Sequence, residues 1–265
     1  MPASMLLLCG PAEHGFANCP HVPVIVMRVN LPNIAYAIAH PRRAFRYLRH
    51  RDRIAYSDIA PFIPRNAVII EAGAHDGTNT VEMAEHWPHA TIHAFEPFPR
   101  AAEVVRQRIE RYGSRVQCHA IGLGPQNGDI DMNVSGDGSA GACQSSSMLA
   151  PTEAQLREFP EIRFGLTHKV PLRTLASWAE ESGVSVIDFM WLDMQGYELQ
   201  ALAGAGGLLQ GVSAIHMEVS NVQLYQGAPL YPEVQARMAA WGFVPVIEAF
   251  FRVAGNVLFV RLPKR

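Results

Sequence analysis

The chain has 265 residues, of which 49% are hydrophobic and 17% are charged, and its formal net charge at neutral pH is −2. A chain of this length and composition can bury a large core, and its nearly neutral charge argues against nucleic acid as a substrate because no broad basic surface is expected. Cys9, Cys19, Cys118 and Cys143 show no metal-ligand spacing, so we expect reduced thiols in a cytoplasmic protein.

Residues 1–53 are predicted to form an N-terminal extension. Its apolar runs, 5–8 and 22–27, are too short to cross a bilayer, so we expect no transmembrane segment and no signal peptide. Six arginines lie between Arg42 and Arg53, with Asp52 as the only acid. Two interpretations remain open for this stretch. It makes peripheral contact with an anionic membrane surface or an acidic partner, or it is a solvated helix that flanks the domain.

The stretch from Val68 to Gly77 has the pattern of a buried strand followed by a ligand-binding turn. The apolar residues after Val68 favour a strand that is covered on both faces. Gly73 and Gly77 allow a sharp turn, so that backbone N–H groups can approach a ligand at the start of a helix expected over residues 78–87. A second apolar run, 90–95, predicts the next strand of a crossover.

Glu96 follows this second strand, at the position where a doubly wound sheet places a carboxylate that binds ribose hydroxyl groups. The glycine spacing excludes a dinucleotide fingerprint, because His75 and Thr78 stand where that motif needs glycine. The remaining pattern, E-x-G-x-x-x-G from Glu71 to Gly77, resembles the loop of S-adenosylmethionine-dependent methyltransferases, in which the acid can face the amino group of the cofactor.

The alternation of strands and helices along the rest of the chain predicts an α/β fold with a doubly wound, mostly parallel sheet. The segment 124–169 is rich in Gly, Ser, Asn and Asp, and we expect an inserted hairpin and loop that lies over the strand ends and builds part of the acceptor site. A disordered connector is the alternative for this segment. We expect helices over residues 97–112, 172–181, 197–209 and 232–241, and strands over 116–123, 186–192 and 214–219.

The runs 243–251 and 256–262 predict an antiparallel hairpin around a turn at Ala254–Gly255. Such a hairpin at the end of a parallel sheet is typical of the class I methyltransferase fold. We therefore expect a Rossmann-like, seven-stranded methyltransferase domain over residues 54–265.

Several blocks of the sequence resemble FkbM-type methyltransferases. DMQGYELQALAGAG, which starts at Asp193, is similar to the family signature, and AFEPFP (94–99), AIGLG (120–124), the serine run with Met148 and Leu149, and HMEVSN (216–221) match in order and rough spacing. The resemblance covers about residues 54–222. The family often has a lysine two residues before the aspartate and a glutamate two residues after it, where this chain has Trp191 and Gln195.

We expect three groups of site residues, of which the resemblance implies Glu71, Gly73, His75, Glu96, Asp193 and Glu218. Around S-adenosylmethionine we expect Glu71, Gly73, His75, Gly77, Glu96 and Ile121. At the reacting end we expect Asp193 and Glu218, and on the acceptor side we expect Ser145, Ser146, Ser147 and His216.

Asp193 is the candidate general base, because it ends a strand at the carboxyl edge of the sheet. One alternative is that Asp193 only caps the following helix. Another is that Asp193 and Glu218 together hold a Mg²⁺ ion that lowers the pKa of the acceptor hydroxyl group.

We expect an O-methyltransferase that acts on a sugar or another polyhydroxylated small molecule, and this acceptor class rests on the family resemblance. One alternative is methylation of an amine or of a lipid-linked glycan at the membrane. Another is a methyltransferase-like binding module without turnover. The sequence contains no feature that predicts an oligomeric state.

Overall fold

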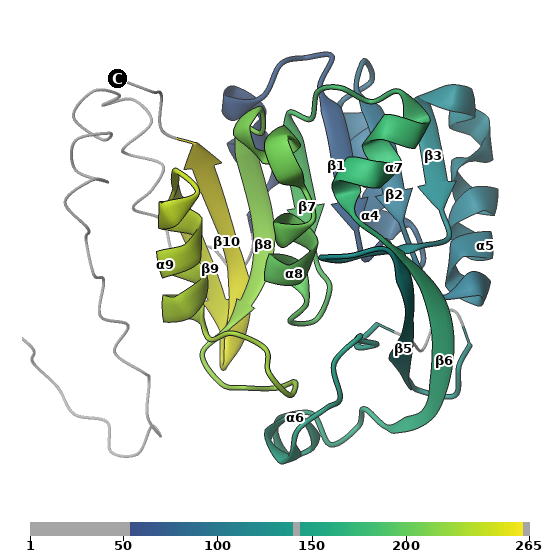
Figure 1. The fold of residues 1–265 in the computed structure, drawn as a ribbon, viewed down its shortest axis with the longest axis vertical. Helices are drawn as coiled ribbons and strands as arrows, with labels where there is room; N and C mark the ends of the chain where they lie inside the picture. The colour runs from purple at the N-terminus through teal and green to yellow at the C-terminus, as the bar shows by residue number, and fades with distance from the viewer. Residues whose placement is uncertain (1–53, 140–143, 262–265) are drawn as a thin grey trace, which may run out of the picture.

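The computed structural model of the chain describes residues 54–139 and 144–261, and within them seven strands form one sheet (Figure 1). Five strands are parallel, and β10 is antiparallel to both of its neighbours. This topology confirms the predicted class I methyltransferase fold. In spatial order the strands are β3 (Val116–His119), β2 (Thr91–Phe95), β1 (Val68–Ala72), β7 (Phe189–Leu192), β8 (Ala214–Ser220), β10 (Ala254–Arg261) and β9 (Phe243–Phe251).

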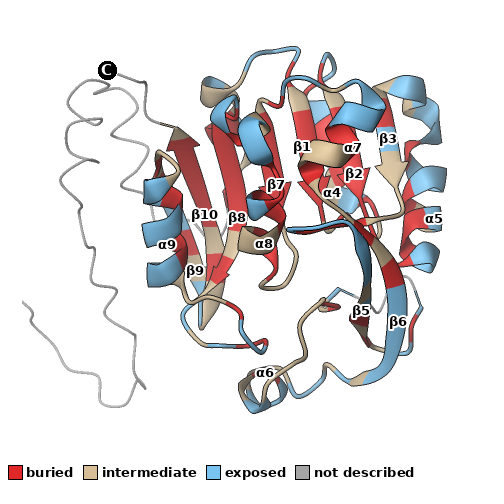
Figure 2. Ribbon diagram, in the orientation of Figure 1, coloured by how far each residue is buried: buried red, intermediate tan, exposed pale blue. Residues whose placement is uncertain are grey.

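Helices cover both faces of this sheet, and the strands between them are largely buried (Figure 2). On one face α3 (Tyr56–Ile59), α4 (Thr78–His86) and α5 (Pro99–Ile109) pack around residues such as Ile69 and Phe189. On the other face α7 (Leu175–Ser182), α8 (Glu198–Ala203) and α9 (Tyr231–Ala240) pack around Phe95, Leu192 and their neighbours. Each large side chain buried in this way contributes about 1.5–3 kcal/mol to the free energy of folding. The sheet is therefore a stable scaffold for the loops at its edge.

A second, three-stranded sheet in the order β4-β6-β5 lies beyond the carboxyl edge of the main sheet, on the side of β1 and β2, and α6 lies beyond β7 and β8 (Figure 1). Its elements are β4 (Gly122–Leu123), β5 (Gly128–Ser135), α6 (Glu153–Glu158) and β6 (Phe164–Arg173). The described part of the segment 124–169 is therefore an antiparallel strand pair with a helix in its connection, and it lies over the strand ends as expected.

Two expected strands are shorter than the sequence pattern predicts. The strand expected over 116–123 divides at His119, because β4 leaves the main sheet and pairs with β6, where Gly122 packs against Leu172. The strand expected over 186–192 begins only at Phe189. Its preceding residue, Asp188, uses its carboxylate to accept a hydrogen bond from the backbone N–H of Val68 at 2.8 Å.

Three expected helices also differ from the prediction. The helix expected from residue 172 begins at Leu175, because the hydroxyl group of Thr174 caps it by accepting from the N–H of Ser177. The helix expected over 197–209 ends at Ala203 and continues as a 3₁₀ turn, since Gly204 lies against the backbone of Gly124. The helix expected over 97–112 is α5, followed by a 3₁₀ segment over 110–115.

The predicted terminal hairpin is present, but its turn lies elsewhere. Arg252 and Val253 form the turn, and Arg252 has a positive φ of 58°. Gly255 lies inside β10, where a Cβ atom would lie 2.5 Å from the carbonyl oxygen of Ala249. Close approach of the strands, and not a left-handed conformation, therefore explains this glycine.

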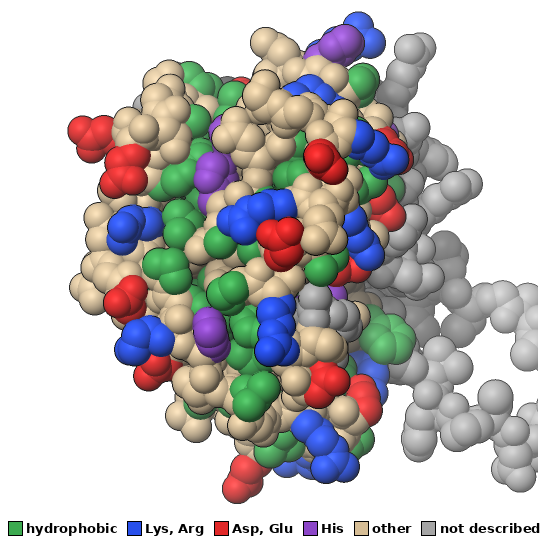
Figure 3. Space-filling view, turned by 90° about the vertical axis from the view of Figure 1, so that its right-hand side faces the viewer, with side chains coloured by type: hydrophobic (Ala, Val, Ile, Leu, Met, Phe, Trp, Pro, Cys, Tyr) green, Lys and Arg blue, Asp and Glu red, His purple; other side chains and the backbone are tan. Residues whose placement is uncertain are grey.

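The surface over α5 and the second sheet carries acidic and basic side chains side by side, with apolar side chains between them (Figure 3). This face lacks the continuous basic stripe that nucleic-acid binding needs. Among the described residues no helix is long and apolar enough to cross a membrane. The arginine-rich stretch between Arg42 and Arg53 lies outside the described residues, so its two interpretations stay open.

Gly73 is the residue on which the junction of β1 and β7 depends. Ala72 pairs with Leu192, so the next residues of the two strands, Gly73 and Asp193, lie side by side. Gly73 has a φ of 88°, and a Cβ atom at this position would lie 1.8 Å from the carbonyl oxygen of Asp193. Only glycine fits here without displacement of the neighbouring backbone.

We therefore predict that Gly73→Ala lowers the free energy of unfolding by about 2 kcal/mol or more, because it combines a left-handed backbone with a backbone clash. Gly165→Ala is the matched control, since nothing lies within 4 Å of its added Cβ and its φ is not in the left-handed region. Urea unfolding followed by circular dichroism measures both variants. Equal stability of the Gly73 variant and the parent protein would contradict the close approach.

Candidate functional site

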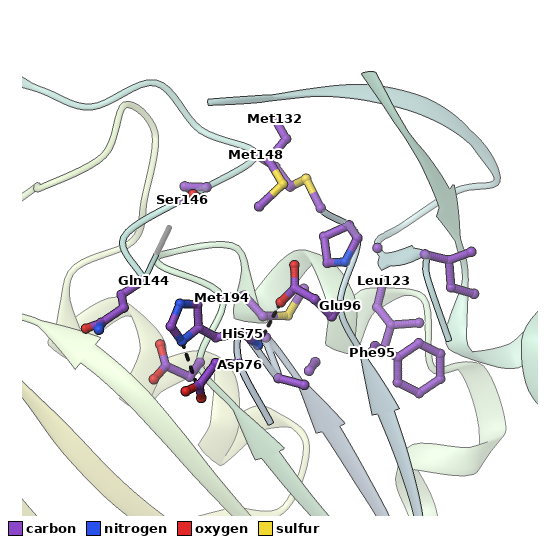
Figure 4. Close-up of a pocket in the computed structure, with 18 of the residues that line it drawn as sticks. His75, Asp76, Phe95, Glu96, Leu123, Met132, Gln144, Ser146, Met148 and Met194 are labelled. Carbon is purple, nitrogen blue, oxygen red and sulfur yellow. Dashed lines mark hydrogen bonds and ion pairs between the residues drawn. The ribbon is translucent and has the colours of Figure 1, made fainter. Parts of the chain in front are cut away.

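A cavity of about 330 Å³ lies at the carboxyl ends of β1 and β2 (Figure 4). Parallel strands of an open sheet place their ligands at this edge. The turn after β1, the start of α4 and the second sheet enclose the cavity. Its walls include Gly73, His75, Asp76, Glu96, Ile121, Met132, Gln144, Ser146, Ser147, Met148, Asp193 and Met194.

Glu96 is the buried acid of this cavity. Its two carboxylate oxygens accept hydrogen bonds from the backbone N–H of His75 at 2.8 Å and of Phe98 at 2.9 Å. Burial raises the pKa of Glu96 to about 7, although these two hydrogen bonds act in the opposite direction. Each oxygen keeps a lone pair, so the carboxylate is fixed by the backbone and can still accept from hydroxyl groups of a ligand.

Glu71 lies beneath the turn and does not line the cavity. One of its oxygens accepts a hydrogen bond from the hydroxyl group of Thr80 at 2.5 Å, and the other, Oε1, is buried without a partner within residues 54–139 and 144–261. Burial raises the pKa of Glu71 to about 8, and the negative charges of Asp193 and Glu96 add to this effect. A carboxyl group in these surroundings is stabilised as an anion when a cation binds nearby.

The remaining residues expected at the cofactor divide into two groups. His75 and Ile121 line the cavity, and Nε2 of His75 is buried without a partner in the part of the chain that the structure describes. Gly77 does not line it, but begins α4 in a left-handed conformation, with a φ of 79°. Gly77 therefore shapes the turn from behind, where its Cβ would lie 3.3 Å from the backbone of Val105.

A second cavity of about 310 Å³ lies at the carboxyl ends of β7 and β8. Asp193 and Gln144 line both cavities, so the two spaces share one wall. The other walls of the second cavity come from α6, from the loop after β8 and from the turn before α8. They include Ser145, Gln155, Phe159, Ile162, Gln195, Glu198, Glu218, Leu224 and Tyr225.

The sheet register explains why Asp193 and Glu218 are neighbours. Leu192 pairs with Met217, so the next residue of each strand carries its side chain to the same edge. Nε2 of Gln195 donates to Asp193 Oδ1 at 2.9 Å and to Glu218 Oε2 at 2.6 Å, and thereby bridges the two acids. The hydroxyl group of Tyr225 lies 2.9 Å from Oε1 of Gln195 and 2.8 Å from the carbonyl oxygen of Ser145, and its single proton serves both.

Burial raises the pKa values of both Asp193 and Glu218. The hydrogen bond from Gln195 opposes this effect at Asp193, whereas the negative charges of Asp193 and Glu198 add to it at Glu218, so Asp193 is the easier of the two acids to ionise. Asp193 is then the anion that faces both cavities.

The capping alternative for Asp193 is wrong. The residue before α8 is Tyr197, which makes no side-chain cap, and the side chain of Asp193 contacts Gln195 instead. Glu198, the first residue of α8, instead holds the preceding turn, because its carboxylate accepts from the backbone N–H groups of Met194 at 2.8 Å and Gly196 at 3.2 Å. Burial raises the pKa of Glu198 to about 7.

The serine run does not gather on one side of the site. Ser145 lines the second cavity, whereas Ser146 and Ser147 line the first. Their hydroxyl groups also hold the loop, since Ser146 accepts from the N–H of Ser135 and Ser147 donates to the carbonyl oxygen of Gln195 at 2.9 Å.

His216, expected on the acceptor side, lines neither cavity, which corrects that prediction. Its ring stacks on Trp191 with a centroid distance of 3.6 Å, and burial lowers its pKa to about 3. The alternation of a strand explains this placement: the side chains at positions 216 and 218 leave the same face, but only position 218 reaches the edge of the sheet. His216 is therefore a core residue.

The residues present do not fit the Mg²⁺ ion considered above. Among the described residues no group of three or more His, Cys, Asp or Glu side chains is placed to hold a metal ion. Between Asp193 and Glu218, moreover, lies the N–H₂ group of Gln195, a donor that occupies the place where a cation would need oxygen ligands.

Sequence reasoning missed four residues of the second cavity as site residues: Gln144, Gln155, Gln195 and Tyr225. Glu198 was part of the quoted motif but received no role. Gln195 carried the one available signal, because it stands where the family often has a glutamate. The others come from segments far apart in the chain, and no spacing within the sequence points to them.

A family model, described as the methyltransferase FkbM domain, matches residues 71–245. The chain is 32% identical over 161 residues to the 2-O-methyltransferase NoeI of Sinorhizobium fredii, an alignment that covers 60% of this chain and 66% of that protein. It is 25% identical over 159 residues to Methyltransferase 1 of Beauveria bassiana, with 56% and 61% covered. The alignments thus span less than two thirds of either relative.

The chain is also 26% identical over 201 residues to Methyltransferase sdnD of Sordaria araneosa, with 68% of this chain and 75% of that protein covered. The crystal structure of a methyltransferase FkbM from Methylobacillus flagellatus superposes with a TM-score of 0.54 at 12% identity, over 83% of this chain and 50% of that one, and this likeness shows the fold. Because the family model matches more than half of its 265 residues, the protein belongs to the FkbM methyltransferase family.

Proposed function

We propose that the protein transfers a methyl group from S-adenosylmethionine to a hydroxyl group of a sugar or another polyhydroxylated small molecule. One observation carries this proposal: Asp193 lies in the wall shared by two cavities, one suited to the cofactor and one to an acceptor. The printed name of one relative, a 2-O-methyltransferase, favours oxygen over nitrogen as the methylated atom.

The first cavity fits S-adenosylmethionine, which supplies an electrophilic methyl group on a positively charged sulfur when bound. Glu96 is fixed by two backbone N–H groups and would accept from the ribose hydroxyls. Oε1 of Glu71 and Nε2 of His75 are buried without partners beside this space. The acids Glu71 and Asp193 would lower the energy of a bound cation, and His75 would position it.

Asp193 acts as the general base in this proposal. It holds the acceptor hydroxyl group at the shared wall and takes its proton as the oxygen bonds to the methyl carbon, while the electron pair of the broken C–S bond stays on sulfur. Gln195 fixes the orientation of Asp193 through its donated hydrogen bond and bridges it to Glu218. A base placed in this way contributes about 10²–10⁴-fold in rate.

Direct base catalysis is favoured over Mg²⁺ because the amide of Gln195 separates the two acids. An amine or a lipid-linked glycan remains the alternative acceptor, and a binding module without turnover remains the alternative class.

We also propose a cytoplasmic location, and a division into residues 1–53 and a methyltransferase domain over 54–265 with an insertion at 124–169. The free, partly buried thiol of Cys118 supports the cytoplasmic location, since reduced cysteines are usual in the cytoplasm.

Glu96→Ala is expected to weaken S-adenosylmethionine binding at least about tenfold, because it removes hydrogen bonds to an ionised acceptor that are worth about 1.5–3 kcal/mol. Isothermal titration calorimetry measures this affinity. Glu110→Ala, which changes an exposed glutamate near the end of α5, is the control and should bind like the parent. If the Glu96 variant binds equally well, Glu96 does not contact the cofactor.

Asp193→Asn should lower kcat by about 10²-fold or more while cofactor affinity and the melting temperature stay close to those of the parent protein. The base must be ionised, and burial raises its pKa, so the rate of the parent should rise with pH through a midpoint above the usual aspartate value. Asp131→Asn, an exposed change on β5, is the control. Normal turnover of the Asp193 variant would end the assignment.

EDTA separates the base from the metal. Because the geometry around Gln195 does not fit Mg²⁺, turnover of the parent protein should be unchanged after treatment with EDTA and after addition of Mg²⁺. Loss of turnover with EDTA, followed by its return with Mg²⁺, would restore the metal site at Asp193 and Glu218.

A further inference from the structure

The second cavity offers hydrogen-bond acceptors and negative charge, but no cation. Its described walls contain three acids, Asp193, Glu198 and Glu218, and no Lys, Arg or His side chain. An anionic ligand would therefore meet repulsion from Asp193 with no cation to offset it. A ligand that brings hydroxyl donors meets suitable partners instead.

Gln155 is an independent sign that a hydrogen-bond donor belongs in this cavity. It lies on α6, is only 2% exposed, and lines the second cavity. Its backbone N–H donates to the capping hydroxyl group of Thr152, but its side-chain Oε1 is buried and has no hydrogen-bond partner among the described residues. A buried carbonyl oxygen that lacks a donor is costly, and a hydroxyl group of a ligand would remove this cost.

Apolar side chains line the same cavity. Leu224 and Ala228 form a small buried cluster, against which Phe159 and Val222 pack, and all four line the cavity. Polar and apolar side chains in one cavity match the surface of a sugar ring, whose hydroxyl groups lie at its rim and whose C–H bonds lie on its faces. A uniformly polar ligand would leave these apolar side chains without apolar contacts. A phosphorylated ligand would be repelled by the acids.

We propose that the second cavity selects an uncharged glycosyl unit and rejects phosphorylated or nucleotide-linked sugars, with Gln155 as a specificity-determining residue. This inference rests on the proposed function, since it names the acceptor class for the same site. The hydroxyl group to be methylated lies at Asp193, a second hydroxyl group donates to Oε1 of Gln155, and the C–H face of the ring packs on Leu224 and its neighbours.

The test compares uncharged and phosphorylated acceptors built on the same sugar rings: the methyl glycosides of glucose, galactose and mannose, and the 1-phosphate and 6-phosphate of each sugar. Two phosphate positions are used so that a blocked hydroxyl group is told apart from repulsion. With labelled S-adenosylmethionine, at least one uncharged glycoside should be methylated with a kcat/KM about 100-fold or more above both of its phosphates.

Equal or better methylation of the phosphates would overturn the proposal, and so would the absence of methylation of every uncharged glycoside by protein that binds S-adenosylmethionine. Calorimetry with the cofactor alone is run in parallel. If the cofactor itself does not bind, the proposed function has failed, and this result differs from failure of the acceptor class.

Gln155→Met keeps the length of the side chain and removes its oxygen. It should raise the KM for the preferred glycoside about tenfold, with kcat and cofactor affinity unchanged, whereas Gln107→Met, on the exposed side of α5, should change neither. An unchanged KM in the folded Gln155 variant would overturn the role of Gln155.

Gln155→Lys is the second variant, and it adds a cation to the cavity. It should reduce the preference for uncharged over phosphorylated sugars at least about tenfold. An unchanged preference would contradict charge selection.

Discussion

The close approach of Gly73 to the main chain of Asp193 is the constraint from which the site follows. Because β1 and β7 are parallel neighbours, their ends meet at one edge, and the missing Cβ lets the two turns touch. The cofactor turn and the acceptor turn therefore share a wall. Two residues beyond each of these positions lie His75 and Gln195, both with a positive φ, 50° and 54°. Such conformations cost about 1 kcal/mol or more and persist where the surroundings impose them. Here they occur at two residues whose side chains lie at the proposed site.

Buried acids are the second common feature of this edge. The pKa values of Glu71, Glu96 and Glu198 are raised to about 8, 7 and 7 by burial. A raised carboxyl pKa means that the folded chain binds the proton more tightly than the unfolded chain, so stability falls as the pH rises from the unfolded value of 4.5 toward 8. Each group contributes a slope of up to about 1.4 kcal/mol per pH unit. A bound sulfonium and amino group would stabilise the ionised acids. The buried acids therefore lower the stability of the protein without ligand and favour the binding of a cation.

The sequence predicted the parts of the molecule that local patterns govern. Apolar runs such as 90–95 placed the parallel strands, and the terminal pair of runs predicted the antiparallel end of the sheet. The predicted ends of strands and helices were wrong where a single tertiary contact decides them, as where the carboxylate of Asp188 accepts from the N–H of Val68. The position of Gln155 depends on how α6 folds over the sheet, and its buried oxygen has no counterpart in any spacing. The role predicted for His216 was wrong for the same reason, because its ring partner Trp191 lies on another strand.

The two departures from the family pattern favour turnover over a passive binding module. Trp191 stacks on His216 and lies near the ring of Tyr56, on the face covered by α3, so the side chain at this position contacts neither cavity. Gln195 places a neutral amide between Asp193 and Glu218. A glutamate here would place another carboxylate beside Asp193 and Glu218 and hold the pKa of the proposed base still higher, whereas the amide donates to Asp193 and lowers its pKa. The amide thus favours the ionised form of Asp193 that proton abstraction needs.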